Sequence, residues 1–192
     1  MDGEFFEECA KLAVENSRRI LSVLTGRDLK VDCQSIDCTG VADLPVLSGQ
    51  FEDIVLSSWV SFRGGMEGQL IILFRPDSAR QLVSFLSPVI TEGVDSEGHY
   101  DIQVSIVSEV ANIVGCSFLD AVADRAEMVL RPSPPLLIRE MAGAILESAM
   151  AVSYFESGRV PAVNVRFSLD GGEAVFEIVL LPGKGLNTVN SS

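Results

Sequence analysis

The stretch DIQVSIVSEVANIVGCSFLDAVAD, residues Asp101–Asp124, is the one around which the chain is organised. Its apolar residues recur at helical spacing, and Ser105, Glu109, Asn112 and Cys116 follow one another at intervals of four, three and four. At about 100° per residue these four side chains fall within an arc of about 60°. The sequence therefore predicts one long helix with an apolar face and a narrow polar stripe, whose carboxylate and carboxamide can hold or orient a polar group.

The chain before this helix predicts helices and a β-hairpin. Glu4–Leu24 has amphipathic helical spacing and ends at Thr25-Gly26, because glycine readily takes the conformation that closes a helix. The remaining predictions are a strand at Leu29–Ile36, a loop at Asp37–Gln50, a hairpin of Phe51–Phe62 and Glu67–Phe74 around Gly64-Gly65, a helix from Pro76 to Leu86, and a linker at Ser87–Tyr100.

The chain after the central helix predicts a second set of the same elements. These are a short strand at Glu127–Arg131, a helix at Leu136–Phe155 preceded by Pro132-Ser133-Pro134-Pro135, and a hairpin of Pro161–Leu169 and Glu173–Leu181 around Asp170-Gly171-Gly172. Residues 184–192 are small and polar, and we expect a flexible tail there.

The two halves match in outline, since each runs from a helix to a strand and closes with a hairpin that has glycines at its turn. This pattern indicates an internal duplication. We expect an α+β fold with pseudo-twofold symmetry, in which helices pack against a largely antiparallel sheet. A single domain would span residues 1–183, with repeats at about 1–90 and 101–183.

Composition limits the function. The formal net charge of the 192 residues is −13, which disfavours nucleic acid and anionic membranes as partners, and 47% of the residues are hydrophobic, enough for a sizeable core. Four cysteines without CxxC spacing and one histidine give no zinc pattern. We expect reduced thiols, no signal peptide, no apolar run of transmembrane length and no membrane insertion, hence a cytoplasmic location.

The residues alone leave the role of the stripe open. An exposed Ser, Glu and Asn on a helix is most often only a solvated surface. His99 lies in a polar linker and is expected at the surface rather than as a base beside Ser105. The paired glycines lie in hairpin turns and not between a strand and a helix, so they form no phosphate-binding loop.

The spacing of the stripe resembles the site motif of the CheC, CheX and FliY chemotaxis phosphatases. That motif is Asp or Ser, three residues, Glu, two residues, Asn, and a proline after 22 more, which is met here by Ser105, Glu109, Asn112 and Pro135. The flanking EVANIVGCSFLDAVAD, PSPPLLIREMAGAILESAMA and FEIVLLPG are also similar to the second half of a CheC protein.

The resemblance implies a phosphatase that dephosphorylates the aspartyl phosphate of a CheY-like response regulator. Asn112 would orient the attacking water by its carboxamide, as a glutamine does in GTPases. Glu109 would pair with a lysine of the regulator, Ser105 would shape the helix surface, and Pro135 would belong to the scaffold. The phosphatase would need no metal or cofactor of its own, because the receiver brings its Mg²⁺.

The first half departs from the family pattern, in which a second copy of the motif is common. Its equivalent positions are Glu8 and Lys11, and no proline stands at the expected distance, near Gln34. Since an ammonium cannot accept a hydrogen bond while it orients water, we expect a single active site.

A competing hypothesis keeps the fold without the catalysis. The chain would then be a binding module for a receiver domain or for a CheD-like deamidase. A third hypothesis is an α+β domain whose stripe faces a partner in a homodimer, so the oligomeric state is left open.

Overall fold

The structure is a computed structural model that describes residues 3–40, 51–86, 96–152, 159–169 and 172–183. Its elements run along the chain as follows: α1 (Gly3–Thr25), β1 (Lys30–Gly40), β2 (Ile54–Gly64), β3 (Gly68–Phe74), α3 (Pro76–Leu86), α4 (Ser96–Arg125), β4 (Leu130–Pro132), β5 (Leu136–Met141), α5 (Ala142–Val152), β6 (Arg159–Leu169) and β7 (Gly172–Pro182). The predicted α+β class is confirmed.

One antiparallel sheet holds all the strands of the described residues. Its order is β1-β6-β7-β3-β2-β4, and β5 also pairs with β2. Exchanging β1 with β4 and β5, β2 with β6, and β3 with β7 turns this order into its own reverse. The sheet is therefore pseudo-twofold symmetric about the β3–β7 pair, as the duplication predicted. The repeat boundaries at about 90 and 101 stay a prediction, and the tail at 184–192 lies outside the described residues.

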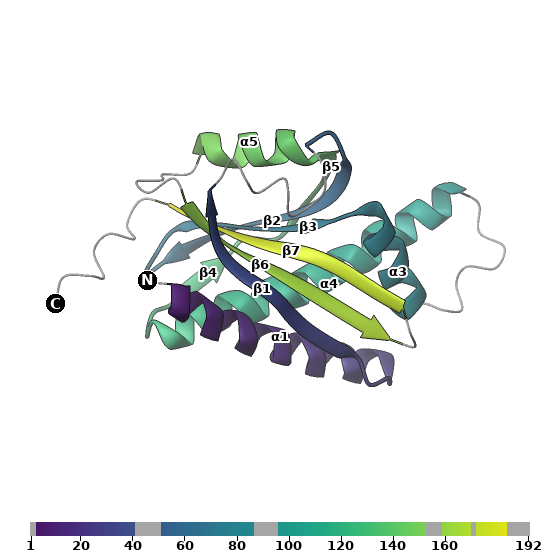
Figure 1. Cartoon of the computed structure of the whole chain (residues 1–192), viewed down its shortest axis with the longest axis horizontal. Coiled ribbons are helices and arrows are strands. Elements are labelled where there is room, and N and C mark those ends of the chain that lie inside the picture. The colour runs from purple at the N-terminus through teal and green to yellow at the C-terminus, as the bar shows by residue number, and fades with distance from the viewer. Residues whose placement is uncertain (1–2, 41–50, 87–95, 153–158, 170–171, 184–192) are drawn as a thin grey trace.

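Helices cover both faces of the sheet (Figure 1). On one face α1, α3 and α4 pack over a large core that includes Phe62, Phe74, Phe118 and Phe176, all at most 1% exposed. On the other face α5 packs over a smaller core that includes Ile71. Alternation along the strands separates the two cores, because successive side chains point to opposite faces of a sheet.

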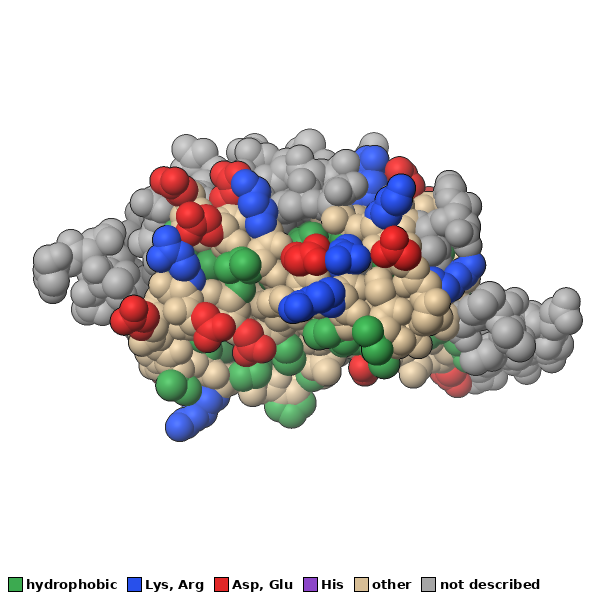
Figure 2. All heavy atoms as spheres, turned by 90° about the horizontal axis from the view of Figure 1, so that it is seen from below, with side chains coloured by type: hydrophobic (Ala, Val, Ile, Leu, Met, Phe, Trp, Pro, Cys, Tyr) green, Lys and Arg blue, Asp and Glu red, His purple; other side chains and the backbone are tan. Residues whose placement is uncertain are grey.

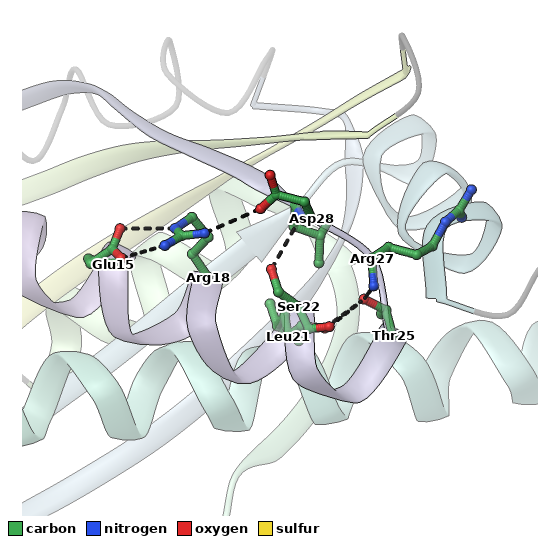
Figure 3. Close-up of polar contacts among 8 residues, drawn as sticks. Glu15, Arg18, Leu21, Ser22, Thr25, Arg27 and Asp28 are labelled. Atoms are coloured by element: carbon green, nitrogen blue, oxygen red, sulfur yellow. Dashed lines mark hydrogen bonds and ion pairs between the residues drawn. The ribbon is translucent and has the colours of Figure 1, made fainter.

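The end of α1 shows why the sequence stops the helix there (Figure 3). The hydroxyl of Thr25 donates to the backbone carbonyl of Leu21 at 2.8 Å and accepts from the backbone N–H of Arg27 at 3.3 Å. Gly26 follows with a φ of 64°, a left-handed conformation that costs glycine little. The predicted termination at Thr25-Gly26 is confirmed.

A buried carboxyl lies in the middle of β7. Glu177 is 4% exposed and faces the α5 side, because its neighbours Phe176 and Ile178 point into the opposite core. Within the described part of the chain its Oε2 has no hydrogen-bond partner. Burial raises the pKa of Glu177 to about 8, and the charge of Arg75 opposes part of that rise.

Several predicted boundaries are wrong. The predicted helix at Leu136–Phe155 begins only at Ala142, because residues 136–141 form β5 against the edge of β2. The start of the predicted loop at Asp37–Gln50 belongs to β1, and the end of the predicted linker is already helical, since α4 starts at Ser96.

The turn after α4 delays the next strand. Glu127 has a φ of 51° and the backbone N–H of Met128 donates to the carbonyl of Ala123 at 2.9 Å, which closes the helix. The predicted strand at Glu127–Arg131 therefore starts only at Leu130.

Among the described residues one helical segment, Tyr100–Arg125, is long and apolar enough to cross a membrane by length and composition. Ser105, Glu109 and Asn112 interrupt the segment, so it holds no unbroken apolar run of that length, although its most apolar stretch has a mean hydropathy of 1.5. Half of that stretch is buried inside the domain, as in the core helix of a globular protein.

Candidate active site on helix α4

The predicted stripe on α4 faces solvent. Ser105, Glu109 and Asn112 are all exposed, while Val110 and Val114, on the other side of the helix, are buried in the main core. Because the three polar residues are three or four positions apart, their side chains lie one above the other. The structure thus brings these three predicted residues onto one accessible surface.

Packing holds α4 firmly against the sheet behind this surface. Val107, Val110, Phe118 and Val122 are at most 1% exposed. At Gly115 the helix approaches β3 so closely that an added Cβ would lie 3.4 Å from the Leu70 side chain. A helix that is buried on its inner side offers a rigid base for polar side chains on its outer side.

Among the described residues Asn112 has one hydrogen-bond partner, Cys116, one turn further along. The thiol of Cys116 donates to the Asn112 Oδ1 at an Sγ–Oδ1 distance of 3.7 Å. Partial burial raises the pKa of the Cys116 thiol, and the nearby Asp120 carboxylate raises it further. The thiol is therefore neutral near pH 7 and has a proton to donate.

Glu109 has no partner within the residues that the structure describes. Neither a hydrogen bond nor an ion pair joins its carboxylate to another side chain in the part of the chain that the structure describes. An exposed, unpaired carboxylate beside an exposed carboxamide can meet a cation of another molecule without first breaking an internal contact.

The equivalent residues on α1 are both engaged. The Glu8 carboxylate accepts from Arg125 at the end of α4, at an Oε2–Nε distance of 2.8 Å. Lys11 pairs with Glu7 one turn earlier, at 2.5 Å. Figure 2 views the outer face formed by the helices below the sheet, where carboxylates, cations and apolar side chains are interspersed. The expectation that this first site is degenerate stays a prediction, although the ion pairs are consistent with it.

Pro135 lies in the exposed segment between β4 and β5. This segment bulges away from β2, since Phe62 pairs with Pro132 and Trp59 with Leu136, which leaves three residues opposite two. The neighbouring Ser133 fixes the bulge, because its backbone N–H donates to the Ser61 carbonyl at 2.7 Å. Prolines are tolerated here because the segment is at a sheet edge. The proposed scaffold role of Pro135 is thus compatible with its place.

One hollow in the structure was not anticipated from the sequence. It lies among β2, β5, α3 and the first turns of α4, and Arg80, Tyr100, Gln103 and Arg139 are among its lining residues. Its volume is about 140 Å³. The Arg139 guanidinium lies 6.0 Å from the centre of the Tyr100 ring, at the outer limit of a cation–π contact. No local pattern predicts this hollow, because the sequence places Arg139 in a helix, whereas it lies in β5.

No group of three or more His, Cys, Asp or Glu residues that could hold a metal ion occurs among the described residues. The side chains of His99, Cys33 and Cys38 lie outside those that are described. Cys9 is a fully buried free thiol between α1 and α4. Cys9 does not extend the polar surface of α4.

Comparison with known proteins gives one curated relative in sequence. No family model matches the chain. The Halobacterium salinarum protein named "Putative CheY-P phosphatase CheC1" is 29% identical over 139 residues, which are 71% of this chain and 66% of that protein. The chain therefore spans about two thirds of the length of this relative.

Solved structures share the fold. Thermotoga maritima FliY superposes with a TM-score of 0.67 at 16% identity, covering 94% of this chain and 91% of FliY. A chain of a CheX–CheY–BeF3–Mg²⁺ complex from Borrelia burgdorferi gives a TM-score of 0.57 at 19% identity, covering 95% of this chain and 99% of the other. These identities are low, so the likeness is one of fold. Together with the sequence relative, it makes the chain similar to the CheC, CheX and FliY proteins, in sequence to the first and in fold to the other two.

Proposed function

We propose that the chain is a phosphatase that hydrolyses the aspartyl phosphate of a CheY-like receiver domain, in chemotaxis or another two-component pathway. One observation carries the proposal: Glu109 and Asn112 are both exposed on one face of α4, and Glu109 has no partner among the described residues. The name of the sequence relative, a CheY-P phosphatase, and the CheX–CheY complex among the structural relatives support the choice of substrate.

Asn112 is the proposed catalytic residue. Its carboxamide would enter the receiver's acidic pocket and hold a water in line with the bond between phosphorus and the aspartyl oxygen. The water oxygen attacks phosphorus, the bond to the aspartyl oxygen breaks, and the receiver regains its carboxylate while orthophosphate leaves. A carboxamide suits this role because it donates and accepts hydrogen bonds without adding charge beside the phosphoryl oxygens.

Glu109 is the proposed docking residue. Its carboxylate lies one turn before Asn112, so an ion pair with a receiver lysine would fix the angle at which the carboxamide enters the pocket. Because Glu109 has no internal ion pair in the described chain, docking would break none.

The metal of the reaction would come with the receiver. A Mg²⁺ ion in the receiver pocket would neutralise the phosphoryl oxygens while Asn112 handles the water. We assign no metal or cofactor to this chain, and no step of the proposal passes through one.

The test is the decay of phosphate on a labelled CheY-like receiver from the same organism, with and without the protein. Wild-type protein should accelerate decay, and Asn112→Ala should lower the acceleration by at least about 100-fold, because a water that is no longer held in line loses most of its reactivity. Glu109→Gln should raise the KM by roughly tenfold with a smaller effect on kcat. Glu147→Gln on the opposite face of the sheet is the matched control, since Glu147 is also an exposed glutamate on a helix.

A receiver that binds the wild-type protein and keeps its phosphate for an unchanged time would contradict the proposal. That result would favour the second candidate, a module that binds a receiver or a CheD-like deamidase without catalysis. Full activity of Asn112→Ala would instead leave the phosphatase standing and refute the role of the carboxamide.

A further inference from the structure

The thiol–carboxamide contact on α4 bears on the geometry of the proposed reaction. An exposed Asn side chain can rotate, and its oxygen and nitrogen ends are nearly equal in size. In this chain the Asn112 Oδ1 lies 3.7 Å from the Sγ of Cys116, which is itself half-buried and anchored one turn along the helix. The contact therefore distinguishes the two ends of the carboxamide.

The direction of this hydrogen bond follows from the charge around the thiol. Cys116 is partly buried, and the carboxylate of Asp120 lies one turn further on. Both effects disfavour a thiolate, so the pKa of the Cys116 thiol is raised. A neutral thiol donates weakly to an oxygen, and this keeps Oδ1 rather than Nδ2 beside the sulfur.

Asn112 and Cys116 have no counterpart on α1. Four positions after Lys11 stands Glu15, whose carboxylate accepts from Arg18 at 2.7 Å. The thiol anchor thus occurs on the helix that has the asparagine and is missing from the helix that has the lysine.

We propose that Cys116 is a positioning residue, whose thiol holds the Asn112 carboxamide in one orientation before the receiver docks. The inference rests on the proposed function, since it concerns the same asparagine. One lone pair of Oδ1 accepts the S–H proton, and the second lone pair and both N–H groups remain available to the water and the phosphoryl group. In this role Cys116 would touch neither the phosphoryl group nor the attacking water.

Three variants separate the donor from the bulk of the side chain. Cys116→Val keeps most of the volume and removes the donor, Cys116→Ala removes both, and Cys116→Ser keeps a donor. Because a neutral hydrogen bond contributes modestly, we expect kcat to fall by about three- to tenfold in the Val and Ala variants with KM little changed, while the Ser variant keeps at least about half of the activity. The same exchange on α1, Cys9→Val, is the matched control and should leave kcat unchanged.

A second measurement reads the carboxamide directly. In the receiver-free protein the side-chain amide resonances of Asn112 should shift, and their fast motion should increase, in Cys116→Val but not in Cys116→Ser or Cys9→Val. A merely structural role for Cys116 would not move these signals selectively.

The outcomes divide cleanly. The proposal is overturned if Cys116→Val and Cys116→Ala both keep the wild-type kcat. It is also overturned if only Cys116→Val loses activity, or if Cys116→Ser is as slow as Cys116→Val. If the wild-type protein does not accelerate dephosphorylation at all, the proposed function fails, and the amide resonances then decide alone: a shift in Cys116→Val supports the positioning role and unchanged signals overturn it.

Discussion

Helices α1 and α4 occupy equivalent places in a pseudo-symmetric fold, but their polar surfaces differ in availability. Glu8 on α1 is held by Arg125, and Lys11 is held by Glu7. On α4, Glu109 has no partner among the described residues and Asn112 meets only the thiol next to it. The comparison teaches that exposure alone does not make a carboxylate available, because an internal ion pair can occupy it.

The apolar surfaces of the two helices differ as well. α1 exposes Leu12, Ile20, Val23 and Leu24 by 44–82%, whereas the large apolar residues of α4 between Val107 and Val122 are buried. α4 is thus a core helix whose outer face carries the polar stripe, and α1 covers it from one side. A polar site on α4 therefore has a more rigid backbone behind it than a site on α1 would have.

The strongest way to break the comparison is to exchange the residues at the two equivalent positions. Asn112→Lys gives α4 the residue that α1 has at the equivalent position, Lys11. We expect a loss of phosphatase activity of at least about 100-fold, because an ammonium cannot accept a hydrogen bond from water. Lys11→Asn should restore nothing, since Glu8 stays paired with Arg125. Receiver dephosphorylation by the double variant measures this directly, and any activity above that of Asn112→Lys alone would show that pairing does not silence α1.

The buried carboxyl of Glu177 should make stability depend on pH, in contrast to the exposed carboxyls of Glu8 and Glu109. The pKa of Glu177 is raised by burial to about 8, from an ordinary value of 4.5. Between these pH values the unfolded chain loses the proton while the folded chain keeps it, so the free energy of unfolding falls as pH rises, by at most about 1.4 kcal/mol per unit. Glu177→Gln should remove this slope and stabilise the protein at pH 8 by several kcal/mol, on the order of the integrated slope.

Urea unfolding between pH 5 and pH 8 checks this expectation. Glu8→Gln and Glu109→Gln, as exposed controls, should leave the slope in place. Parallel pH profiles for wild type and Glu177→Gln would show that Glu177 ionises normally in the folded protein.

Each of the two helices has one cysteine whose side chain is described, and the two thiols differ in accessibility. Cys9 on α1 is 0% exposed, and burial raises the pKa of its thiol to about 11. Cys116 on α4 is half-buried, so we expect iodoacetamide to label Cys116 at least about tenfold faster than Cys9 in the folded protein. Mass spectrometry of the separated peptides gives both rates. Equal rates would mean that the helices separate readily, and unfolding in urea should equalise them.

The smallest effect concerns the ion pair that joins the helices. Arg125→Gln should lower the Tm by no more than about 2 °C, because both side chains of the Glu8–Arg125 pair are about half exposed and solvent screens their attraction. Thermal unfolding of Arg125→Gln, Glu8→Gln and the double variant measures the pair. A larger drop would show that the pair holds α1 and α4 together rather than only engaging Glu8.

Local sequence signals predicted most of the elements because those elements are locally determined. Gly26 predicts where α1 ends, and Pro76 predicts where α3 begins. The glycines at its turn predict the β2–β3 hairpin. The polar stripe of α4 could also be found, because its period is that of one helix and needs no distant partner.

What the sequence could not show depends on contacts between distant segments. Residues 136–141 read as part of a helix because an apolar run fits either period, and the edge of β2 makes them a strand. The pairing of Glu8 with Arg125 spans most of the chain, and no local pattern signals it. The Cys116–Asn112 contact was visible only as a spacing, since its direction depends on burial.

The order of the strands also determines how this protein can be made. The β6–β7 hairpin lies between β1 and β3, so β1 is separated from the β2–β3 hairpin of its own half. The partner of β1 is β6, from the second half. A ribosome that has released only the first half has therefore produced a β1 with nothing to pair with and a β2–β3 hairpin with an open edge. The sheet is complete only when β7, which ends at Pro182, has left the ribosome. A chain cut between α3 and α4 should consequently yield two fragments that are active only after they are mixed.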